Sequence, residues 1–157
     1  MSLDPKDWPE LQRPLEIVNV HIAPPHFYKP PLYGFVIRNQ QVRALENHFS
    51  APPRDDPASQ SPASVLIGDF NATPLWPLYR RIASQFTDAA IAVAQVCGRP
   101  AEPTWSLPAN TPRRLRIDHA FVRGVTPREF QAVRIAGSDH SAIVVDIADR
   151  TNQSSSS

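Results

Sequence analysis

The chain has 157 residues, of which 41% are hydrophobic and 20% are charged, and this balance fits one folded domain and excludes a disordered protein. A net charge of +1 predicts no general affinity for nucleic acid, although a local basic patch could still bind it. No apolar run approaches the roughly 18 residues that cross a bilayer, and no signal peptide is visible. The single Cys97 excludes an intramolecular disulfide and is compatible with a reducing compartment. We expect a cytoplasmic location, with a membrane-anchored or secreted full-length parent as the alternative.

The first half of the chain alternates between strand patterns and a helix pattern. The strand patterns are rich in β-branched residues. The helix pattern places Ile37, Gln41, Leu45 and Phe49 on one face. In chain order, the predicted elements are a strand at 15–22, a proline- and aromatic-rich loop at 23–33, a helix at 35–49, a polar connection at 50–62 and a strand at 63–69.

The second half begins with helix-start signals, since Asn71, Thr73 and Pro74 precede an apolar pattern that continues to about Phe86. Residues 87–96 fit a short helix or a strand, and both interpretations stay open. The remaining predictions are a loop at 98–114, a strand at 116–123, a hairpin partner near 130–135, a strand at 141–148, and a disordered Ser-rich tail at 149–157 that leaves 1–148 as the domain.

Residues 65–71 read VLIGDFN, an apolar run that ends in polar side chains. Asp69 and Asn71 lie two positions apart, so on an extended segment they project to the same side. A carboxylate there can orient and deprotonate a water, and the amide can hold a phosphate oxygen or a metal-bound water. The other interpretation is that both residues belong to a turn and a helix cap.

Two further clusters, RIDH at 116–119 and GSDH at 137–140, also adjoin strand patterns. Asp139 offers the oxygen that a hard cation prefers, and His140 can contact a phosphate or transfer a proton. Asp118 can fix the tautomer of that histidine. The alternatives are a polar turn after Gly137 and a structural aspartate, while His119 should point to the opposite face of its strand.

Two other polar features allow both a functional and an ordinary interpretation. His21 ends the strand pattern VNVH, and a lone histidine there is usually ordinary. A basic cluster, Arg113, Arg114 and Arg116, has Trp105 nearby. This cluster could bind phosphates or stack on a base, or it could be a solvated loop.

Taken together, the order VNVH, IGDFN, TW, RIDH and GSDH resembles the endonuclease/exonuclease/phosphatase superfamily, which includes deoxyribonuclease I-like nucleases and inositol polyphosphate phosphatases. The resemblance runs from about residue 15 to residue 148. It implies in-line attack of water on phosphorus, with Mg²⁺ stabilising charge on the leaving oxygen. By this resemblance His21 contacts the scissile phosphate, Asp69 positions the attacking water and Asn71 binds the phosphate. His140 is the catalytic histidine, and Asp118 orients it. Asp139 belongs to the metal site.

The resemblance covers the C-terminal half of a family domain, because the strand-end asparagine and glutamate that the first half supplies have no match before VNVH. It implies an α/β (α+β) fold, half of a four-layered sandwich, with one mixed sheet and helices 35–49 and 74–86 on one face. We expect weak binding of Mg²⁺, or of Mn²⁺ or Ca²⁺, and weak or absent phosphoester hydrolysis. The alternative is a non-catalytic fragment or binding module that keeps the motifs.

The resemblance leaves the substrate open among nucleic acid, a phospholipid head group and an inositol phosphate. The strands are apolar on both alternating sets of positions, which calls for cover on both sheet faces. Two helices can cover one face only, and monomers rarely leave so large an apolar patch exposed. We therefore predict a homodimer through the exposed sheet face.

Overall fold

The structure is a computed structural model that describes residues 1–9, 11, 13–25, 31–50, 62–109 and 111–149. Most of the predicted polar connection and of the Ser-rich tail lie outside the described residues. The elements are β1 (Ser2–Leu3), β2 (Leu15–His21), α1 (Pro31–Ser50), β3 (Ala63–Asp69), α2 (Pro77–Ala83), β4 (Thr87–Asp88), α3 (Ala89–Cys97), β5 (Asp118–Arg123), β6 (Val125–Arg134) and β7 (Ser141–Asp149).

A mixed five-stranded sheet with the order β1-β2-β3-β5-β4 forms the centre of the fold. β2 and β3 run parallel and lie on either side of α1 in the sequence, whereas β5 returns antiparallel to β3. Parallel neighbours need a long crossover, which α1 provides together with its flanking connections. The predicted α/β class and the mixed sheet are confirmed.

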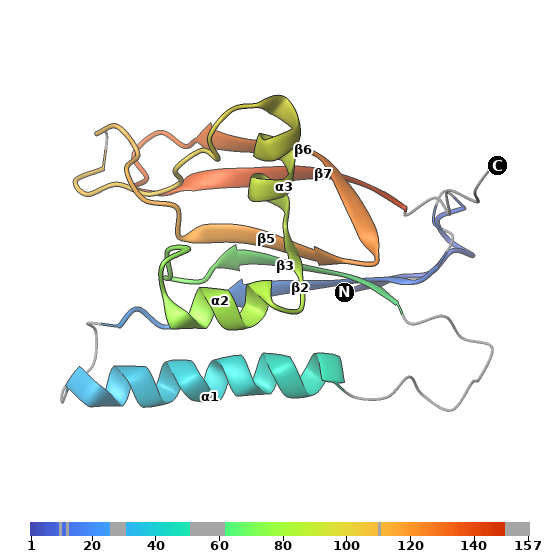
Figure 1. Cartoon of the computed structure of the whole chain (residues 1–157), viewed down its shortest axis with the longest axis horizontal. Helices are drawn as coiled ribbons and strands as arrows, with labels where there is room; N and C mark the ends of the chain where they lie inside the picture. The colour runs from blue at the N-terminus through green and yellow to red at the C-terminus, as the bar shows by residue number, and fades with distance from the viewer. Residues whose placement is uncertain (10, 12, 26–30, 51–61, 110, 150–157) are drawn as a thin grey trace.

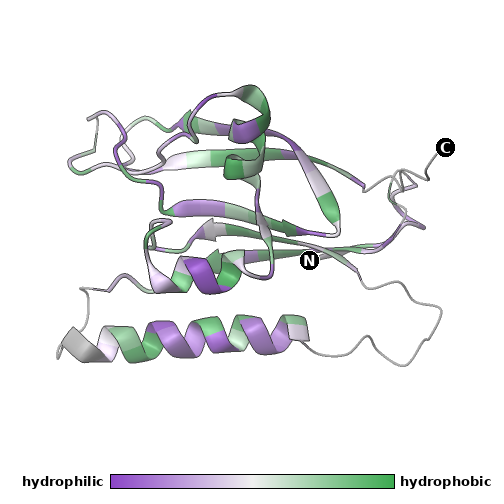
Figure 2. Cartoon of the chain, viewed as in Figure 1, coloured by the Kyte–Doolittle hydropathy of each residue, from purple (hydrophilic) through white to green (hydrophobic). Residues whose placement is uncertain are grey.

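The two helices α1 and α2 lie on one face of this sheet (Figure 1). Two residues of the predicted helix face, Leu45 and Phe49, pack against the apolar cluster around Leu66 and Phe121, and Val42, which was not assigned to that face, is fully buried. Figure 2 shows the polar and hydrophobic bands that alternate along α1. No helix in the described part of the chain is both long and apolar enough to span a membrane.

The helix predicted at 74–86 is shorter in the structure, because α2 begins only at Pro77. Proline at the first helical position has its φ already set and needs no N–H partner, and Trp76 before it is extended. The ambiguous segment 87–96 contains both predicted types, since the short strand β4 leads directly into α3. Asp88 caps that helix by accepting a hydrogen bond from the Ile91 amide at 3.2 Å.

The opposite face of the sheet is covered by α3 and by a second, two-stranded sheet of β6 and β7. The strand predicted at 141–148 is β7, and it pairs with β6 outside the central sheet. Gly124, at φ 78°, makes the turn between β5 and β6 that lets the chain leave the first sheet. A β-carbon there would come 3.2 Å from the Cα of Ala63, so the turn also packs closely against β3.

This second layer changes the argument for a homodimer. Val65 and Val122 of the central sheet share a buried cluster with Val93 of α3 and Phe130 of β6. The face that we expected to be bare is therefore packed within one chain. The homodimer stays a prediction, but it no longer follows from an uncovered central sheet.

Candidate active site

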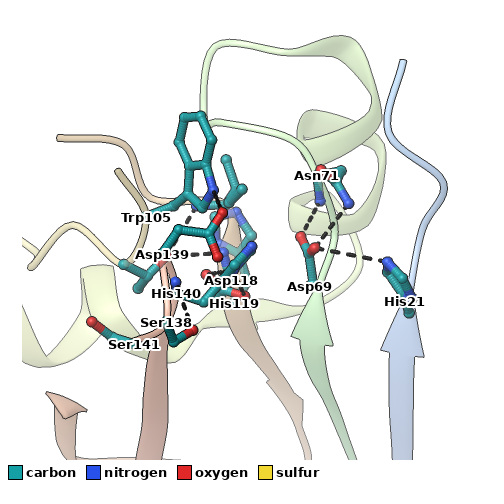
Figure 3. Close-up of polar contacts among 12 residues, drawn as sticks. His21, Asp69, Asn71, Trp105, Asp118, His119, Ser138, Asp139, His140 and Ser141 are labelled. Carbon is teal, nitrogen blue, oxygen red and sulfur yellow. Dashed lines mark hydrogen bonds and ion pairs between the residues drawn. The ribbon is translucent and has the colours of Figure 1, made fainter. Parts of the chain in front are cut away.

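Three polar residues form a row across neighbouring strands at one end of the central sheet (Figure 3). In the sheet register His21 of β2 lies beside Asp69 of β3, and Asp69 lies opposite Asp118 of β5. Side chains alternate between the faces of a strand, and all three share the face that carries Val65 and Val122. The row therefore faces the second sheet, at whose edge β7 begins.

Gly68 allows the close approach of β2 and β3 next to this row. Its φ is 142°, and a β-carbon at this position would lie 2.1 Å from the carbonyl oxygen of Val20. No side chain fits that space, so only glycine permits the two strands to bring His21 and Asp69 together. This explains the glycine in the predicted IGDFN motif.

Asp69 is held mainly by its neighbour in the same motif. The backbone amide of Asn71 donates to Oδ1 at 2.7 Å, and the Asn71 side-chain Nδ2 donates to Oδ2 at 2.8 Å. His21 Nε2 lies 3.9 Å from the same Oδ2. Burial raises the pKa of Asp69, the Asn71 amide lowers it, the charge of Asp118 raises it, and the two histidines lower it, with a net rise.

Asn71 has a different immediate role from the predicted one. One hydrogen of its Nδ2 goes to Asp69 and the other to the carbonyl oxygen of Ile22 at 2.9 Å, so both amide donors are in use. Its backbone lies in the left-handed region at φ 47°, which asparagine tolerates better than most residues. Asn71 positions Asp69 here, and binding a phosphate oxygen through the amide would require one of these bonds to open.

His140 lies above the row, at the start of β7. Its Nδ1 is 3.1 Å from both carboxylate oxygens of Asp118, as predicted for an aspartate that orients a histidine. Because a carboxylate accepts, Nδ1 carries a proton and Nε2 is the nitrogen that remains for a ligand. Asp118 is itself fixed, since its backbone amide donates to the hydroxyl of Thr104 at 3.1 Å.

Of the two interpretations of the arginine cluster, a phosphate grip or a solvated loop, neither describes Arg113 in the structure, because its guanidinium bonds to the chain itself. Its guanidinium donates to the hydroxyls of Ser106 and Ser141 and to the carbonyl oxygens of Ser138 and His140, at 2.8–3.2 Å. These bonds tie the loop before β5 to the segment that carries His140. Arg113 therefore holds these two segments of the candidate site together. Arg114 is the exposed residue of this cluster.

Trp105 and Asp139 form a second connection between the same two segments. The indole Nε1 of Trp105 donates to Asp139 Oδ2 at 3.1 Å, and its backbone bridges to Leu115 and His140. The Asp139 carboxylate is thus engaged with an indole. It does not belong to the group of residues in the described chain whose donor atoms cluster tightly enough for one cation.

A buried polar network lies behind the row, on the opposite face of β5. His119 points there, as predicted: its Nε2 donates to the Ala72 carbonyl at 2.7 Å, and its Nδ1 accepts from Arg116. Arg116 also pairs with Asp88 at 2.7 Å, and the Tyr79 hydroxyl donates to the same carboxylate. Burial raises the pKa of Asp88, but the neighbouring His119 and the bonds from Arg116 and Tyr79 hold it well below its usual range.

The same network acts on Tyr79, whose pKa is raised to about 12 by burial and by its bond to Asp88. Arg116 and Asp88 are both almost completely buried, so Arg116 is part of the core and fits neither a phosphate grip nor a solvated loop. The network supports the segment after Asp69, because Ala72 directly follows Asn71 in the chain.

Arg38 is a residue near the site that we did not predict. It lies on the inner face of α1, where it donates to the carbonyl oxygens of Ala23 at 2.5 Å and of Asn71 at 3.1 Å. It also lies over the ring of Trp76. Burial lowers the pKa of Arg38, and the charge of Asp69 raises it. The only sequence signal was a basic residue between Ile37 and Gln41, which belong to the predicted inner face.

Asp69, Asp118 and His140 offer donor atoms that all lie within 4.8 Å of one another. Two carboxylates and an imidazole are a partial ligand set for a divalent cation. Ca²⁺ prefers six or more oxygen ligands, and Mg²⁺ prefers near-octahedral geometry. Two carboxylates meet here, and a cation between them would offset their charge. The donor set is compatible with a divalent cation.

The site residues line an open cavity of about 820 Å³. The predicted convergence is confirmed, although Asp118 reaches the cavity through its contact with His140 rather than by lining it. The roles that we assigned to the individual residues stay predictions. The residues lining the cavity are His21, Pro24, Pro25, Asp69, Asn71, Thr73, Trp76, Trp105, Leu107, Leu115, Ile117, Asp139 and His140.

Solved structures share this fold at low sequence identity. A humanized TDP2 from D. rerio with 14 mutations is 19% identical at a TM-score of 0.58, and the match covers 86% of this chain and 55% of that one. A mannosyl-6-phosphatase from Bacteroides thetaiotaomicron is 16% identical at 0.55, covering 87% and 51%. The human Nocturnin catalytic domain with bound sulfate is 17% identical at 0.53, covering 87% and 47%.

At these identities the likeness shows the fold alone, and the chain spans about half the length of these structures. No curated protein sequence matches the chain. A sequence-family model described as the Endonuclease/Exonuclease/phosphatase family matches residues 14–140, which include all the predicted site residues. Because this match extends over most of the sequence, the chain belongs to the endonuclease/exonuclease/phosphatase family.

Proposed function

We propose that this site hydrolyses phosphoesters by in-line attack of water on phosphorus. The observation that carries the proposal is the row His21–Asp69–Asp118 across three strands, with His140 bonded to Asp118 above it. Family membership and neighbours named as a phosphatase support phosphoester chemistry. The substrate stays open among nucleic acid, a phospholipid head group and an inositol phosphate.

In this proposal Asp69 orients the attacking water and takes its proton. The new bond joins the water oxygen to phosphorus, and the bond from phosphorus to the alcohol oxygen breaks. His140 contacts a phosphate oxygen through Nε2, while Asp118 stabilises its charged form from the other side of the ring. His21 reaches the phosphate from β2, where 76% of its side chain is exposed.

A divalent cation, for which we propose Mg²⁺, would supply positive charge for the phosphate and the leaving oxygen. The carboxylates of Asp69 and Asp118 would hold it, beside His140, whose charged ring in this proposal binds the phosphate instead. Two carboxylates are few ligands for an ion that dehydrates reluctantly, so we expect weak binding and slow turnover. A binding module that holds phosphate without turnover is the second candidate, and this small ligand set is the observation that favours it.

The test is hydrolysis of bis(p-nitrophenyl) phosphate and p-nitrophenyl phosphate with and without Mg²⁺, comparing the wild type with Asp69→Asn and His140→Gln. We expect slow Mg²⁺-dependent turnover that falls about a hundredfold in either variant, the usual contribution of a positioned acid or base. The matched control is His48→Gln, a surface histidine paired with Glu16 at 2.8 Å. Equal rates in wild type and Asp69→Asn would contradict the proposal, and phosphate binding without turnover would favour the binding module.

A further inference from the structure

The cavity at the candidate site is mostly apolar, with a few polar side chains in its lining. These include His21 and Asp69 of the row, together with His140. Ligand sites of this size are commonly apolar with a few polar groups that fix the orientation of the ligand. The apolar lining residues are Pro24, Pro25, Trp76, Trp105, Leu107, Leu115 and Ile117.

Two leucines of this wall are unusually exposed. Leu107 is 73% exposed and Leu115 is 43% exposed, and both border the same cavity. A single exposed leucine is ordinary, as Leu75 illustrates at 79% exposure outside the cavity. Here two exposed leucines and two indoles line one cavity together with charged residues, a combination typical of a ligand-binding site.

The two indoles are held in place before any ligand arrives. Trp105 is fixed through its Nε1 bond to Asp139, and Trp76 lies under the guanidinium of Arg38 at 5.2 Å from the ring centroid. Side chains that are already ordered lose little conformational freedom on binding, so contact with them contributes more to affinity. The wall is therefore a preorganised surface.

The charges along the cavity argue against a substrate with several phosphates. None of the lining residues in the described part of the chain is lysine or arginine. The nearby Arg38 already donates to the carbonyl oxygens of Ala23 and Asn71. A second or third phosphate would thus meet Asp139 and apolar walls, and a polyanion usually requires several cationic partners.

We propose that this wall is a subsite for an apolar group esterified to the phosphate, so that the site prefers a singly phosphorylated ester of an apolar alcohol over a polyphosphate. This inference rests on the proposed function, because it takes the phosphate to lie at the row. The apolar group is a flat ring, as in a nucleobase-bearing or aryl ester, or a chain, as in a lipid, and the two sources share the same wall chemistry.

The test is an NMR titration of the indole N–H signals in the presence of Mg²⁺. Phenyl phosphate, hexyl phosphate, methyl phosphate and an inositol polyphosphate are the probes. We expect phenyl or hexyl phosphate to bind at least about tenfold tighter than methyl phosphate, the gain from burying a ring or a chain. Trp76 and Trp105 should shift, whereas Trp8, which is 51% exposed and outside the cavity, is the internal control. Whichever of phenyl phosphate and hexyl phosphate binds more tightly shows whether the cavity prefers a ring or a chain.

The double variant Leu107→Ser/Leu115→Ser should abolish this preference and leave methyl phosphate binding unchanged, and Leu75→Ser is the matched control on an exposed leucine. Equal affinity for all monophosphates, or tightest binding of the polyphosphate, would overturn the inference while leaving the phosphate site intact. Benzyl alcohol separates the two failures: if no phosphate binds but this probe shifts Trp76 and Trp105, the proposed function fails and the preference for an ester fails with it, although the cavity still binds apolar groups. If neither binds, the inference is overturned too.

Discussion

Asn71 combines a strained backbone with two bonds that hold Asp69, so its contributions can be separated by substitution. Asn71→Gly removes the side-chain bonds to Asp69 and Ile22 but suits the left-handed conformation at φ 47°, whereas Asn71→Ala removes the same two side-chain bonds and adds strain. We expect the alanine variant to be less stable than the glycine variant by about 1 kcal/mol. Urea denaturation measures this difference. Both variants should lose hydrolysis equally, and equal stability would contradict the backbone argument.

The pKa of Asp88 makes a prediction about pH. Its folded-state pKa lies below the unfolded value of about 3.9, so its stabilisation is present above that pH and is lost as the pH falls toward the folded pKa. Asp88→Asn keeps the cap on α3 but removes the charge, leaving Arg116 buried without its ion-pair partner. We expect a loss of about 3 kcal/mol at pH 7, as for other broken buried pairs.

The measurement is urea denaturation of wild type and Asp88→Asn at pH 7 and pH 3. The wild type should lose more stability than the variant between these values, because only the wild type has this carboxylate to protonate. The difference between the two proteins should narrow by about 1.4 kcal/mol for each pH unit below 3.9. Parallel pH profiles would show that the charge of Asp88 does not stabilise the fold.

The residues of the row could be predicted because each adjoins a strand pattern, and strand ends that meet at one sheet edge bring their side chains together. Asp69, Asp118 and His140 were identified this way. The partners of Arg113 and Arg116 could not be predicted, since Ser138 and Asp88 lie more than 20 positions away in the sequence. An arginine looks alike in a sequence whether it binds a ligand or its own chain.

At the scale of elements, Arg113 joins the loop before β5 to the start of β7. Arg113→Lys keeps the charge but cannot reproduce four bonds from one planar group. We expect faster amide hydrogen exchange at Ser141, whose N–H donates to the Thr104 carbonyl at 2.7 Å, and a loss of about 1–3 kcal/mol for hydrogen bonds to a charged group. The matched control is Arg114→Lys, on the exposed neighbour. Identical rates of hydrogen exchange at the Ser141 amide in the two variants would show that Arg113 does not hold the two segments together.

The strands were predicted better than the boundaries of the helices. The residues 15–22 and 63–69 match β2 and β3 almost to the residue, because runs of β-branched residues are informative. The helix α2 begins at Pro77, later than predicted, because an earlier start would have placed this proline inside the helix. The sheet to which β7 belongs depends on the turn at Gly124, and periodicity within a strand carries no information on its neighbours.

At the scale of the whole molecule, the predicted homodimer can now be tested against the observed layers. Both faces of the central sheet have cover within one chain, but Val133 and Val144 of the second sheet remain 44% and 49% exposed. If the homodimer forms, light scattering at micromolar concentration should give twice the monomer mass of 17.5 kDa, and Val144→Lys should reduce it to the monomer. A monomer mass for the wild type would contradict the homodimer.

The central claim is that water attacks phosphorus at the row of His21, Asp69 and Asp118. The most direct measurement is hydrolysis of a phosphodiester in ¹⁸O-labelled water with Mg²⁺, followed by mass spectrometry of both products. We predict that the label enters the phosphate product of the wild type, with none in the alcohol, and that Asp69→Asn forms almost no labelled product. Label in the alcohol, labelled phosphate formed equally by Asp69→Asn, or no labelled product from the wild type would contradict the account.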